Sequence, residues 1–375
     1  MDQIIVENVR CFRKRQTVPL APLTFLVGEN SSGKSTFLAV TRLAWDVAAV
    51  AKILNFNEEP FPLGAYDQIA TRLGSQGRAA KFFAIGGRFA GHSESFTARF
   101  DSREDQPTLV RCSYETSSGS EIEVEYDASG SPSPRKSSRA LLRFRRLALS
   151  EPRPYAFAPI RTRPKRTYDA LQEILDPEGS HVPMILHNIS RDREIWERLS
   201  SALEGFGRAS GLFDRVEVKA FADQGGGPFQ IEVCIGDASR NFIDVGYGVS
   251  QILPIVVDCL RGKEGSAFLL QQPEVHLHPK AQAELSSFLA LLAKQQRKQF
   301  LIETHSDYLV DRIRMDVRDR KNGLQPEDVV ILYFERQKGE AKIHPLTLDE
   351  YGNLLNVPPG FRSFFLEEDR RFLGG

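Results

Sequence analysis

The sequence predicts an α/β fold with a mixed, partly parallel core sheet, an antiparallel β subdomain and a partly helical insertion. Strand and helix patterns alternate from residue 267 to 335, as is typical of parallel strands joined by helical crossovers. Short runs in which apolar and polar residues alternate fill residues 81–126 and indicate antiparallel strands. Near the start, an apolar strand at 23–28 leads through a glycine-rich turn into a helical pattern over 34–54.

The composition is that of an ordinary globular protein. Of the 375 residues, 41% are apolar and 26% are charged, and Lys plus Arg equal Asp plus Glu at 49 each. The total charge therefore favours no class of partner. The four cysteines are far apart and form no CxxC pair, which argues against a zinc site or a disulfide framework and predicts a reduced, cytoplasmic protein. No run of 18 apolar residues occurs, so we expect no membrane-spanning helix and no membrane partner.

The remaining elements follow in chain order from the same patterns. We expect a strand at 4–10, a loop rich in serine and proline at 128–139, and an irregular, largely helical segment at 167–210. Strands at 214–221 and 229–235 then lead to a glycine-rich turn. The last third is predicted as helix 251–261, strand 267–272, helix 280–296, strand 299–304, helix 307–318 and strand 328–335.

The segment GENSSGKST, residues 28–36, fits the pattern G-x-x-x-x-G-K-[ST] between a predicted strand and a predicted helix. Its glycines let the backbone curl so that N–H groups face phosphates, and the helix N-terminus adds the positive end of its dipole. Lys34 is expected to reach the β- and γ-phosphates, and Ser35 to bind Mg²⁺. A chance glycine turn is the alternative. The segment predicts binding of ATP and Mg²⁺ by Gly28, Asn30, Ser31, Ser32, Gly33, Lys34, Ser35 and Thr36.

A second glycine turn precedes a helix in DVGYGVSQILPIV, residues 244–256. Gly246 and Gly248 allow backbone N–H groups to face an anion, and Pro254 is expected near the start of the helix, where its missing N–H is tolerated. One interpretation is a turn that binds the γ-phosphate held by the first loop of another chain. The other is an ordinary glycine turn that caps a helix.

In this order, GENSSGKST, GYGVSQ, LLQQPEVHLHP and ETHSD resemble the ABC-type ATPase heads of the SMC, RecF and OLD group. More narrowly, they resemble the compact bacterial AAA-family ATPases often found in anti-phage defence operons. Segments 158–168 and 349–368 are also similar to that subgroup, so the resemblance covers nearly the whole chain. It implies ATP bound in a dimer between the P-loop of one chain and the signature turn of the other. In this arrangement Gly246, Gly248, Ser250 and Gln251 act in trans, although GYGVSQ departs from the LSGGQ signature of transporters and SMC proteins.

The resemblance also implies an ABC-type head made of three parts. These are a P-loop lobe with the antiparallel subdomain at 1–130, a basic, partly helical insertion at 131–240, and a lobe with the signature and Walker B segments at 241–375.

Two glutamines stand where the resemblance implies acids. In such families the first acid before Pro-Glu helps to bind Mg²⁺, and its neighbour polarises water. Gln271 can offer a carbonyl oxygen to the metal and Gln272 can orient water, but neither amide can accept a proton. Glu274 and Glu303 are candidate replacement carboxylates, and His305 matches the switch histidine that contacts the γ-phosphate.

Three hypotheses about turnover stay open. The protein hydrolyses ATP slowly, since phosphoryl transfer depends mostly on positioning and electrostatics. It holds ATP as a clamp with little hydrolysis. Or one glutamine is an engineered Glu→Gln change that stalls the enzyme. Metal ligation by His276 and His278 is disfavoured, since no Cys/His cluster completes a site, and hydrogen bonding at the dimer interface is the preferred hypothesis.

Residues 131–166 form a basic stretch with a single acid, Glu151. It predicts DNA or RNA binding through the phosphate backbone, with a solvated loop as the alternative. For Arg161 and Arg166, the resemblance implies a role near the nucleotide or the dimer surface. The basic residues of the stretch are Arg135, Lys136, Arg139, Arg143, Arg145, Arg146, Arg153, Arg161, Arg163, Lys165 and Arg166.

The sequence thus predicts a dimeric ATPase that acts as a sensor or regulator in bacterial defence or DNA maintenance. No long heptad pattern separates the P-loop from the signature, and no acidic nuclease cluster follows residue 335. If nucleic acid is cut, we therefore expect an effector protein to cut it. The main alternative is an ATP-gated scaffold that does not hydrolyse ATP and holds the effector. A transporter ATPase is a third interpretation, which the departing signature disfavours.

Overall fold

The computed structural model forms two compact units. Unit 1 combines residues 1–153 with residues 326–375, and unit 2 is the continuous segment 154–325. These limits differ from the predicted boundaries at 130 and 240, because the helices after residue 241 pack on a helix at 193–210. The structure describes residues 1–48, 54–74, 77–91, 93–115, 121–127, 153–169, 175–221, 227–361 and 371. Among these, no helix is long and apolar enough to cross a membrane.

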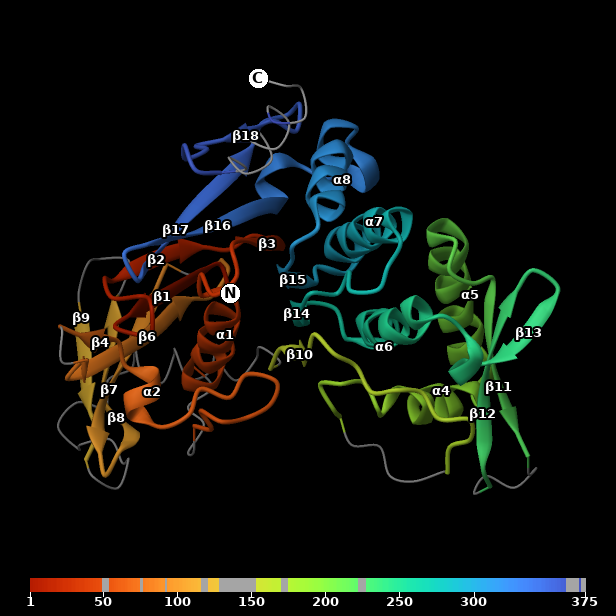
Figure 1. The fold of residues 1–375 in the computed structure, drawn as a ribbon, viewed down its shortest axis with the longest axis horizontal. Coiled ribbons are helices and arrows are strands. Elements are labelled where there is room, and N and C mark those ends of the chain that lie inside the picture. Colours follow the sequence, from red (N-terminus) through yellow and green to blue (C-terminus); the bar gives the residue numbers. More distant parts are fainter. Residues whose placement is uncertain are drawn as a thin grey trace. The chain divides into compact units, whose positions relative to one another are not determined.

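Unit 1 contains a six-stranded antiparallel sheet in the order β2-β1-β6-β7-β8-β9 (Figure 1). The short alternating runs predicted over 81–126 form its larger part. The first strand is shorter than the predicted 4–10, because Asn8 and Arg10 adopt positive φ angles of 54° and 46° that end the extended backbone. The strands are β1 (Gln3–Glu7), β2 (Gln16–Pro19), β6 (Phe82–Arg88), β7 (Ser95–Arg103), β8 (Gln106–Glu115) and β9 (Glu121–Glu125).

The second layer of unit 1 carries the first glycine-rich loop. Strand β3 (Leu23–Gly28) pairs in parallel with β16 (Val329–Gln337), and β17 (Glu340–Leu348) and β18 (Leu354–Leu355) continue antiparallel from it. Helix α1 (Lys34–Ala48) is buried along nearly its whole length and contacts β1, β3 and β6. Residues 49–53 of its predicted continuation to residue 54 lie outside the described residues, and Leu54 is not helical. The short elements of this unit are α2 (Tyr66–Ile69), β4 (Arg72–Leu73), β5 (Arg78–Ala79) and η4 (Pro326–Asp328).

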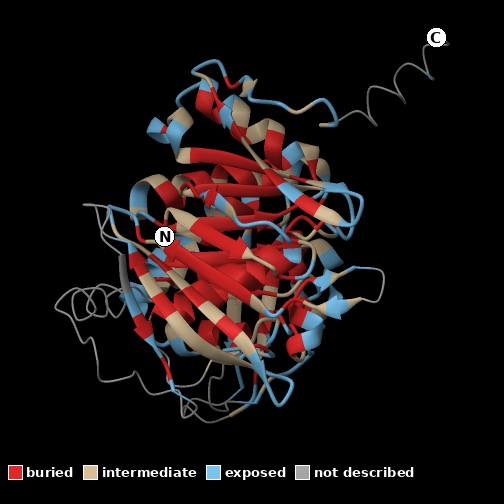
Figure 2. Cartoon of the chain, turned by 90° about the vertical axis from the view of Figure 1, so that its left-hand side faces the viewer, coloured by how far each residue is buried: buried red, intermediate tan, exposed pale blue. Residues whose placement is uncertain are grey.

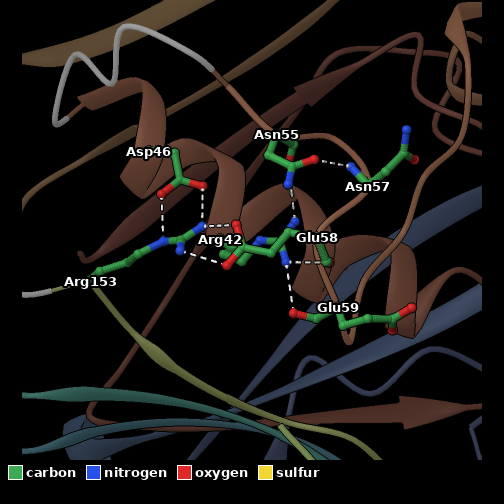
Figure 3. A network of polar contacts seen from close by, with 7 residues as sticks. All are labelled: Arg42, Asp46, Asn55, Asn57, Glu58, Glu59 and Arg153. Carbon is green, nitrogen blue, oxygen red and sulfur yellow. Dashed lines mark hydrogen bonds and ion pairs between the residues drawn. The ribbon is translucent and has the colours of Figure 1, made fainter. Parts of the chain in front are cut away.

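A network of charged side chains braces α1 (Figure 3). Arg153 donates to both Asp46 carboxylate oxygens at 2.8 and 2.9 Å and to both Glu58 oxygens at 2.7 and 2.6 Å. Arg42, almost fully buried, donates to the Glu58 carbonyl at 2.6 Å. Bidentate pairs of this kind fix geometry as well as charge, so the network fastens residue 153 to the last turns of α1.

Unit 2 contains the predicted parallel strands. β14 (Ala267–Gln271) lies between β10 (Tyr155–Phe157) and β15 (Gln299–Glu303), and both pairings are parallel. Helices α7 (Pro279–Gln296) and α8 (Asp307–Arg318) follow β14 and β15 and pack on each other. Figure 2 colours many strand residues of the chain as buried, and β14 and nearly all of β15 are buried as well, in agreement with the continuous apolar runs of parallel strands that helices cover.

The rest of unit 2 is a helical layer with a small antiparallel sheet. The predicted irregular helical segment resolves into α4 (Val182–Ser190) and α5 (Arg193–Ser210), and α5 begins where the Asp192 carboxylate accepts from Ile195 N–H at 3.1 Å. α5 packs on α6 (Tyr247–Arg261) and α7. The other elements are β11 (Arg215–Ala220), β12 (Phe229–Ile235), β13 (Ala238–Asn241), η2 (Phe242–Asp244) and η3 (Lys321–Gly323).

Candidate nucleotide-binding site

The loop between β3 and α1 has the curled form that the sequence predicts. Lys34 is 3% exposed, and its Nζ donates to the carbonyl oxygens of Gly28 at 2.9 Å and Glu29 at 2.8 Å. These bonds draw the loop back over the first turn of α1. Lys34 therefore lies inside the curl, where its charge adds to the positive end of the helix dipole.

Only glycine fits at the two glycine positions of the pattern in this loop. Gly28 has a φ of 142°, and a Cβ there would lie 2.5 Å from the Phe334 carbonyl oxygen of β16. Gly33 has a φ of 104°, and a Cβ there would lie 2.7 Å from Cys11 Sγ and 2.8 Å from Phe12 Cζ. The backbone conformation and the close packing both exclude a side chain at either position.

The other predicted residues of the loop differ in accessibility. Asn30, Ser31 and Ser35 are exposed, whereas Ser32 and Thr36 are buried. Thr36 Oγ1 accepts a hydrogen bond from Arg10 at 3.2 Å, so its hydroxyl has an intramolecular partner. Ser35 keeps its side chain at the surface of the first helical turn, which is the place that binding a metal beside a phosphate requires.

The second glycine segment is helical rather than a loop. The predicted helix at 251–261 begins at Tyr247, so that Gly248, Ser250 and Gln251 belong to the first turns of α6 and Gly246 is its N-cap residue. Pro254 is inside the helix, not near its start as predicted. Glycine at 248 is required by packing, since a Cβ would lie 2.9 Å from the His276 carbonyl oxygen. The first N–H groups of a helix have no carbonyl partner in a preceding turn, and in α6 the Val249 N–H donates to the Gly246 carbonyl at 3.1 Å.

Ser250 and Gln251 make contacts within their own unit. Ser250 Oγ donates to the Tyr247 carbonyl at 3.0 Å. The buried Gln251 side chain accepts from Arg161 N–H at 3.1 Å and donates to the Arg161 carbonyl at 3.5 Å. Their predicted contact with nucleotide stays a prediction, and the exposed residues at the start of this helix are Gly246 and Tyr247.

The two strand ends of unit 2 meet as the sequence predicts. Gln271, the last residue of β14, pairs in register with Glu303, the last residue of β15. Both side chains are buried, and Gln271 Nε2 donates to Glu303 Oε2 at 3.4 Å. The predicted strand ends one residue early because Gln272 has a φ of 42°. Gln272 is half-buried beyond this edge, and its N–H donates to the Glu303 carbonyl at 2.8 Å.

Glu274 and His305 are joined at the same edge. Glu274 is 8% exposed, and its Oε1 accepts from the His305 N–H at 2.8 Å. Burial raises the pKa of Glu274 above its ordinary value, although this hydrogen bond opposes the shift. The side chain of His305 is exposed. The four predicted catalytic residues, Gln272, Glu274, Glu303 and His305, therefore lie together at the carboxyl ends of β14 and β15.

The two histidines of the HLH segment have separate structural positions. His278 is the N-cap of α7, where its Nδ1 accepts from Lys280 N–H at 3.3 Å. His276 is exposed and its ring lies 5.6 Å from the ring of Tyr247. Nowhere in the described part of the chain do three or more His, Cys, Asp or Glu side chains form a metal cluster.

Magnesium needs oxygen ligands, and the residues present fit it. Within unit 2, Gln271 Oε1 is buried and has no hydrogen-bond partner among the described residues, so it is an oxygen of the kind that Mg²⁺ takes as a ligand. This oxygen is neutral, so the negative charge that Mg²⁺ prefers has to come from the phosphates of the nucleotide.

Much of the basic stretch, residues 128–152, lies outside the described residues. In the remainder, Arg153 is bound by Asp46 and Glu58, and Arg166 forms a bidentate pair with Asp244 at 2.8 and 2.7 Å. Arg163 and Lys165 are exposed. Nucleic-acid binding by this stretch stays a prediction.

Sequence reasoning missed Arg10. Its guanidinium donates to Thr36 Oγ1 and to the carbonyls of Leu63 and Gln68. It therefore ties the segment after β1 to the first turn of α1 and to the segment around α2. In the sequence, the signal for such a role is the break in the alternation of apolar and polar residues after residue 7. The predicted strand at 4–10 runs across this break.

Most of the chain matches a known protein family. Residues 23–311 match the family described as "AAA domain, putative AbiEii toxin, Type IV TA system". Residues 324–362 match a second family, "Protein of unknown function (DUF3696)". No curated protein matches the chain.

Solved structures show the same fold at low sequence identity. An Smc head bound to the C-terminal winged-helix domain of ScpA is 13% identical, with a TM-score of 0.54 over 92% of this chain and 98% of that chain. An Smc head with an extended coiled coil, bound to the C-terminal domain of ScpA from Pyrococcus furiosus, is 11% identical, with a TM-score of 0.49 over 100% of this chain and 98% of that chain. The first of these two similarities shows that the fold is that of an SMC-type ATPase head. Because the family match spans most of the sequence, including the loop at 28–36 and the strand ends at 271 and 303, the chain belongs to the AbiEii-like AAA domain family.

Proposed function

We propose that this AAA-family protein binds Mg-ATP and hydrolyses it slowly as a dimer. The observation that carries this proposal is the loop at 28–36, whose lysine is buried inside the curl and whose two glycines exclude side chains. Such a loop presents N–H groups and a cation to a polyphosphate. Each nucleotide lies between the loop of one chain and the start of α6, Gly246 to Gly248, of the second chain.

Hydrolysis needs a group that accepts a proton from the attacking water. Neither Gln271 nor Gln272 can accept one, whereas Glu303 is a carboxylate at the same strand edge. In this assignment, Glu303 accepts the proton of the attacking water and Gln272 orients that water. His305 contacts the γ-phosphate. When Mg²⁺ is bound, it neutralises part of the negative charge of the phosphates. With one amide in place of each usual acid, the expected rate is low.

Phosphate release from Mg-ATP tests this assignment. We expect Lys34→Ala to abolish ATP binding and Glu303→Gln to abolish turnover while ATP binding is kept. Lys263→Ala and Glu327→Gln are matched controls at exposed positions and should behave as wild type. If Glu303→Gln still hydrolyses ATP, the general base would be Glu274 and not Glu303. If the wild-type protein does not bind ATP, the whole proposal is contradicted.

A second candidate function rests on the pair between Gln271 and Glu303. An amide that donates to the candidate base occupies that base in the resting protein, which favours an ATP-gated scaffold with little turnover. ATP retained by a stable dimer through gel filtration, with no phosphate released over hours, would support the scaffold over the enzyme.

The biological role belongs to the same proposal. The family description names a toxin of a type IV toxin–antitoxin system, and the segments quoted above resemble ATPases of defence operons. We propose a regulator in defence or DNA maintenance, located in the cytoplasm, whose ATP state controls an effector protein. Oligonucleotide binding by wild type and by Arg163→Glu, Lys165→Glu tests whether nucleic acid is a partner as well. Binding that the double change leaves intact would remove these two residues from any contact.

A further inference from the structure

The buried side chain of Arg161 is held in place by the helix that begins at the second glycine segment. Arg161 follows β10 and is 3% exposed. Gln251 of α6 bonds both the N–H and the carbonyl of Arg161, so its amide holds that residue from two sides. At the other end of the side chain, Nη1 donates to the Pro159 carbonyl at 2.9 Å. The guanidinium is therefore fixed relative to the first turns of α6.

The remaining edge of this guanidinium has no partner among the residues that the structure describes. Nε and Nη2 are both buried, and neither makes a hydrogen bond. These two N–H groups lie side by side and form the edge with which arginine binds an oxyanion through two parallel bonds. Burial lowers the pKa of Arg161 to about 10, which leaves it charged at neutral pH. A buried cation with two unused donors is costly unless a ligand completes it.

Two oxyanions are candidates for this edge. Glu274 lies close enough to raise the pKa of Arg161. Its Oε2 is also buried and has no hydrogen-bond partner among the described residues, so the two groups do not bond each other. The second candidate is a phosphate. Lys34, the lysine of the phosphate-binding loop, is buried to the same 3% exposure, so enclosure of this degree is compatible with a phosphate ligand.

We propose that the Nε and Nη2 edge of Arg161 binds the γ-phosphate of the nucleotide, and that Gln251 positions it. The proposal rests on the function given above, because it uses the same nucleotide at the start of α6. It makes Arg161 the residue that distinguishes ATP from ADP, since only ATP carries the phosphate that completes the edge. It also gives Gln251 a positioning role in place of direct contact with the nucleotide.

Calorimetric titration of the purified full chain with ATPγS and with ADP, both with Mg²⁺, tests this. We expect Arg161→Met to weaken ATPγS binding by about tenfold or more, the usual range for a lost charge-assisted pair, with little change for ADP. Arg161→Lys keeps the charge without the two-pronged edge and should restore only part of the preference. Arg163→Met, two residues away and exposed, should keep the wild-type preference.

Thermal unfolding without nucleotide separates this role from a structural one. Replacing a structural arginine lowers the melting temperature, whereas replacing an unpaired buried cation by an apolar side chain of similar volume leaves it unchanged or raises it. If Arg161→Met does not fold, Gln251→Leu offers a second route, because it releases Arg161 and should reduce the preference for ATPγS to an intermediate value.

The outcomes distinguish this inference from the proposed function. If wild type binds ATPγS and Lys34→Ala does not, while Arg161→Met keeps the wild-type ratio of ATPγS to ADP affinity, the inference about Arg161 is overturned and the nucleotide-binding function stands. Loss of oligonucleotide binding in Arg161→Met with an unchanged ratio would overturn it too, because the phosphate would then be that of a nucleic acid. If wild type binds neither nucleotide, both proposals fall.

Discussion

Gln271 donates from its amide nitrogen to the carboxylate of Glu303 at 3.4 Å, across the ends of two neighbouring parallel strands. A glutamine at this place avoids the repulsion that two buried carboxylates would have. Its other polar side-chain atom, Oε1, has no hydrogen-bond partner in the described part of the chain. The pair therefore keeps the edge stable without a cation and still offers one ligand to a cation.

Restoring an acid at Gln271 should make this edge depend on magnesium. In Gln271→Asp two carboxylates face each other, so we expect the melting temperature in EDTA to fall by about 2–4 °C, as for a loss near 1 kcal/mol, and to recover with Mg²⁺. Turnover of Mg-ATP should rise. Gln337→Asp is the control, since Gln337 pairs with Glu335 at an exposed site where water screens the charge. Equal sensitivity of both variants to Mg²⁺ would contradict the prediction.

Gly33→Ala should cost both stability and nucleotide binding. Its φ of 104° and the Cβ position 2.7 Å from Cys11 Sγ combine strain with a clash, so we expect a loss of roughly 1–3 kcal/mol in urea unfolding and no ATP binding. Gly265→Ala carries only the strain, because Gly265 has a φ of 78° with nothing within 4 Å of its Cβ position. A larger loss in Gly265→Ala than in Gly33→Ala would show that the packing around Cys11 yields easily.

The charge pair between Glu58 and Arg153 should give a defined dependence of stability on pH. The hydrogen bond from Arg153 lowers the pKa of Glu58 below its ordinary 4.5, whereas burial raises the pKa of Asp46. A lowered carboxyl pKa stabilises the fold above pH 4.5, and this contribution is lost as pH falls through the lowered value.

We therefore expect wild type to exceed Glu58→Gln by about 0.5–1 kcal/mol in unfolding free energy at pH 7, a modest amount because the pair is partly exposed. The difference should disappear in acid. Asp46 is present in both proteins, so only the part of its pKa shift that Glu58 causes enters the difference. In the Arg153→Met background the same comparison should give a smaller pH dependence, because only burial and Arg42 still shift the pKa of Glu58. In the wild-type background, a difference that stays constant into acid would refute this account.

His278 should act as a helix cap and not as a metal ligand. Its Nδ1 accepts from Lys280 N–H at the start of α7, so His278→Ala should lower the unfolding free energy by about 1 kcal/mol, and His278→Asn should restore most of it. Chelators should have the same effect on wild type and on both variants. If a chelator lowered the stability of the wild type but left that of His278→Ala unchanged, the result would instead favour a metal.

Long periodic segments were predictable from the sequence. The strand at 23–28, the helix at 307–318 and the parallel strands that end at residues 271 and 303 lie where their apolar patterns indicate. Strand β10 was not predicted, because three residues carry no periodicity, and only its pairing with the buried β14 makes Tyr155–Phe157 a strand. The start of α6 was placed four residues late, because glycine was interpreted as a turn residue where packing on the His276 carbonyl required it inside a helix.

In the candidate site too, local features were predictable from the sequence and contacts between distant residues were not. The loop at 28–36 is local, so its motif predicts its curl from nine consecutive residues. The meeting of residues 271 and 303 followed from adjacent parallel strands. The hold of Gln251 on Arg161 could not be predicted, because 90 residues separate the two and neither pattern indicates the other. Contacts between side chains that are distant in the chain depend on packing that a single sequence does not encode in any short motif.

The pairing of β3 with β16 also has a consequence for biosynthesis. The conformation of Gly28, and with it the entry to the nucleotide loop, depends on the Phe334 carbonyl, which is translated long after it. At about 5–20 residues per second, the ribosome adds that stretch on the order of tens of seconds later. During this interval the nascent chain carries the motif without the neighbouring strand that shapes it. The ability to bind ATP should therefore arise only after β16 has been synthesised, which makes nucleotide binding a late step in the folding of unit 1.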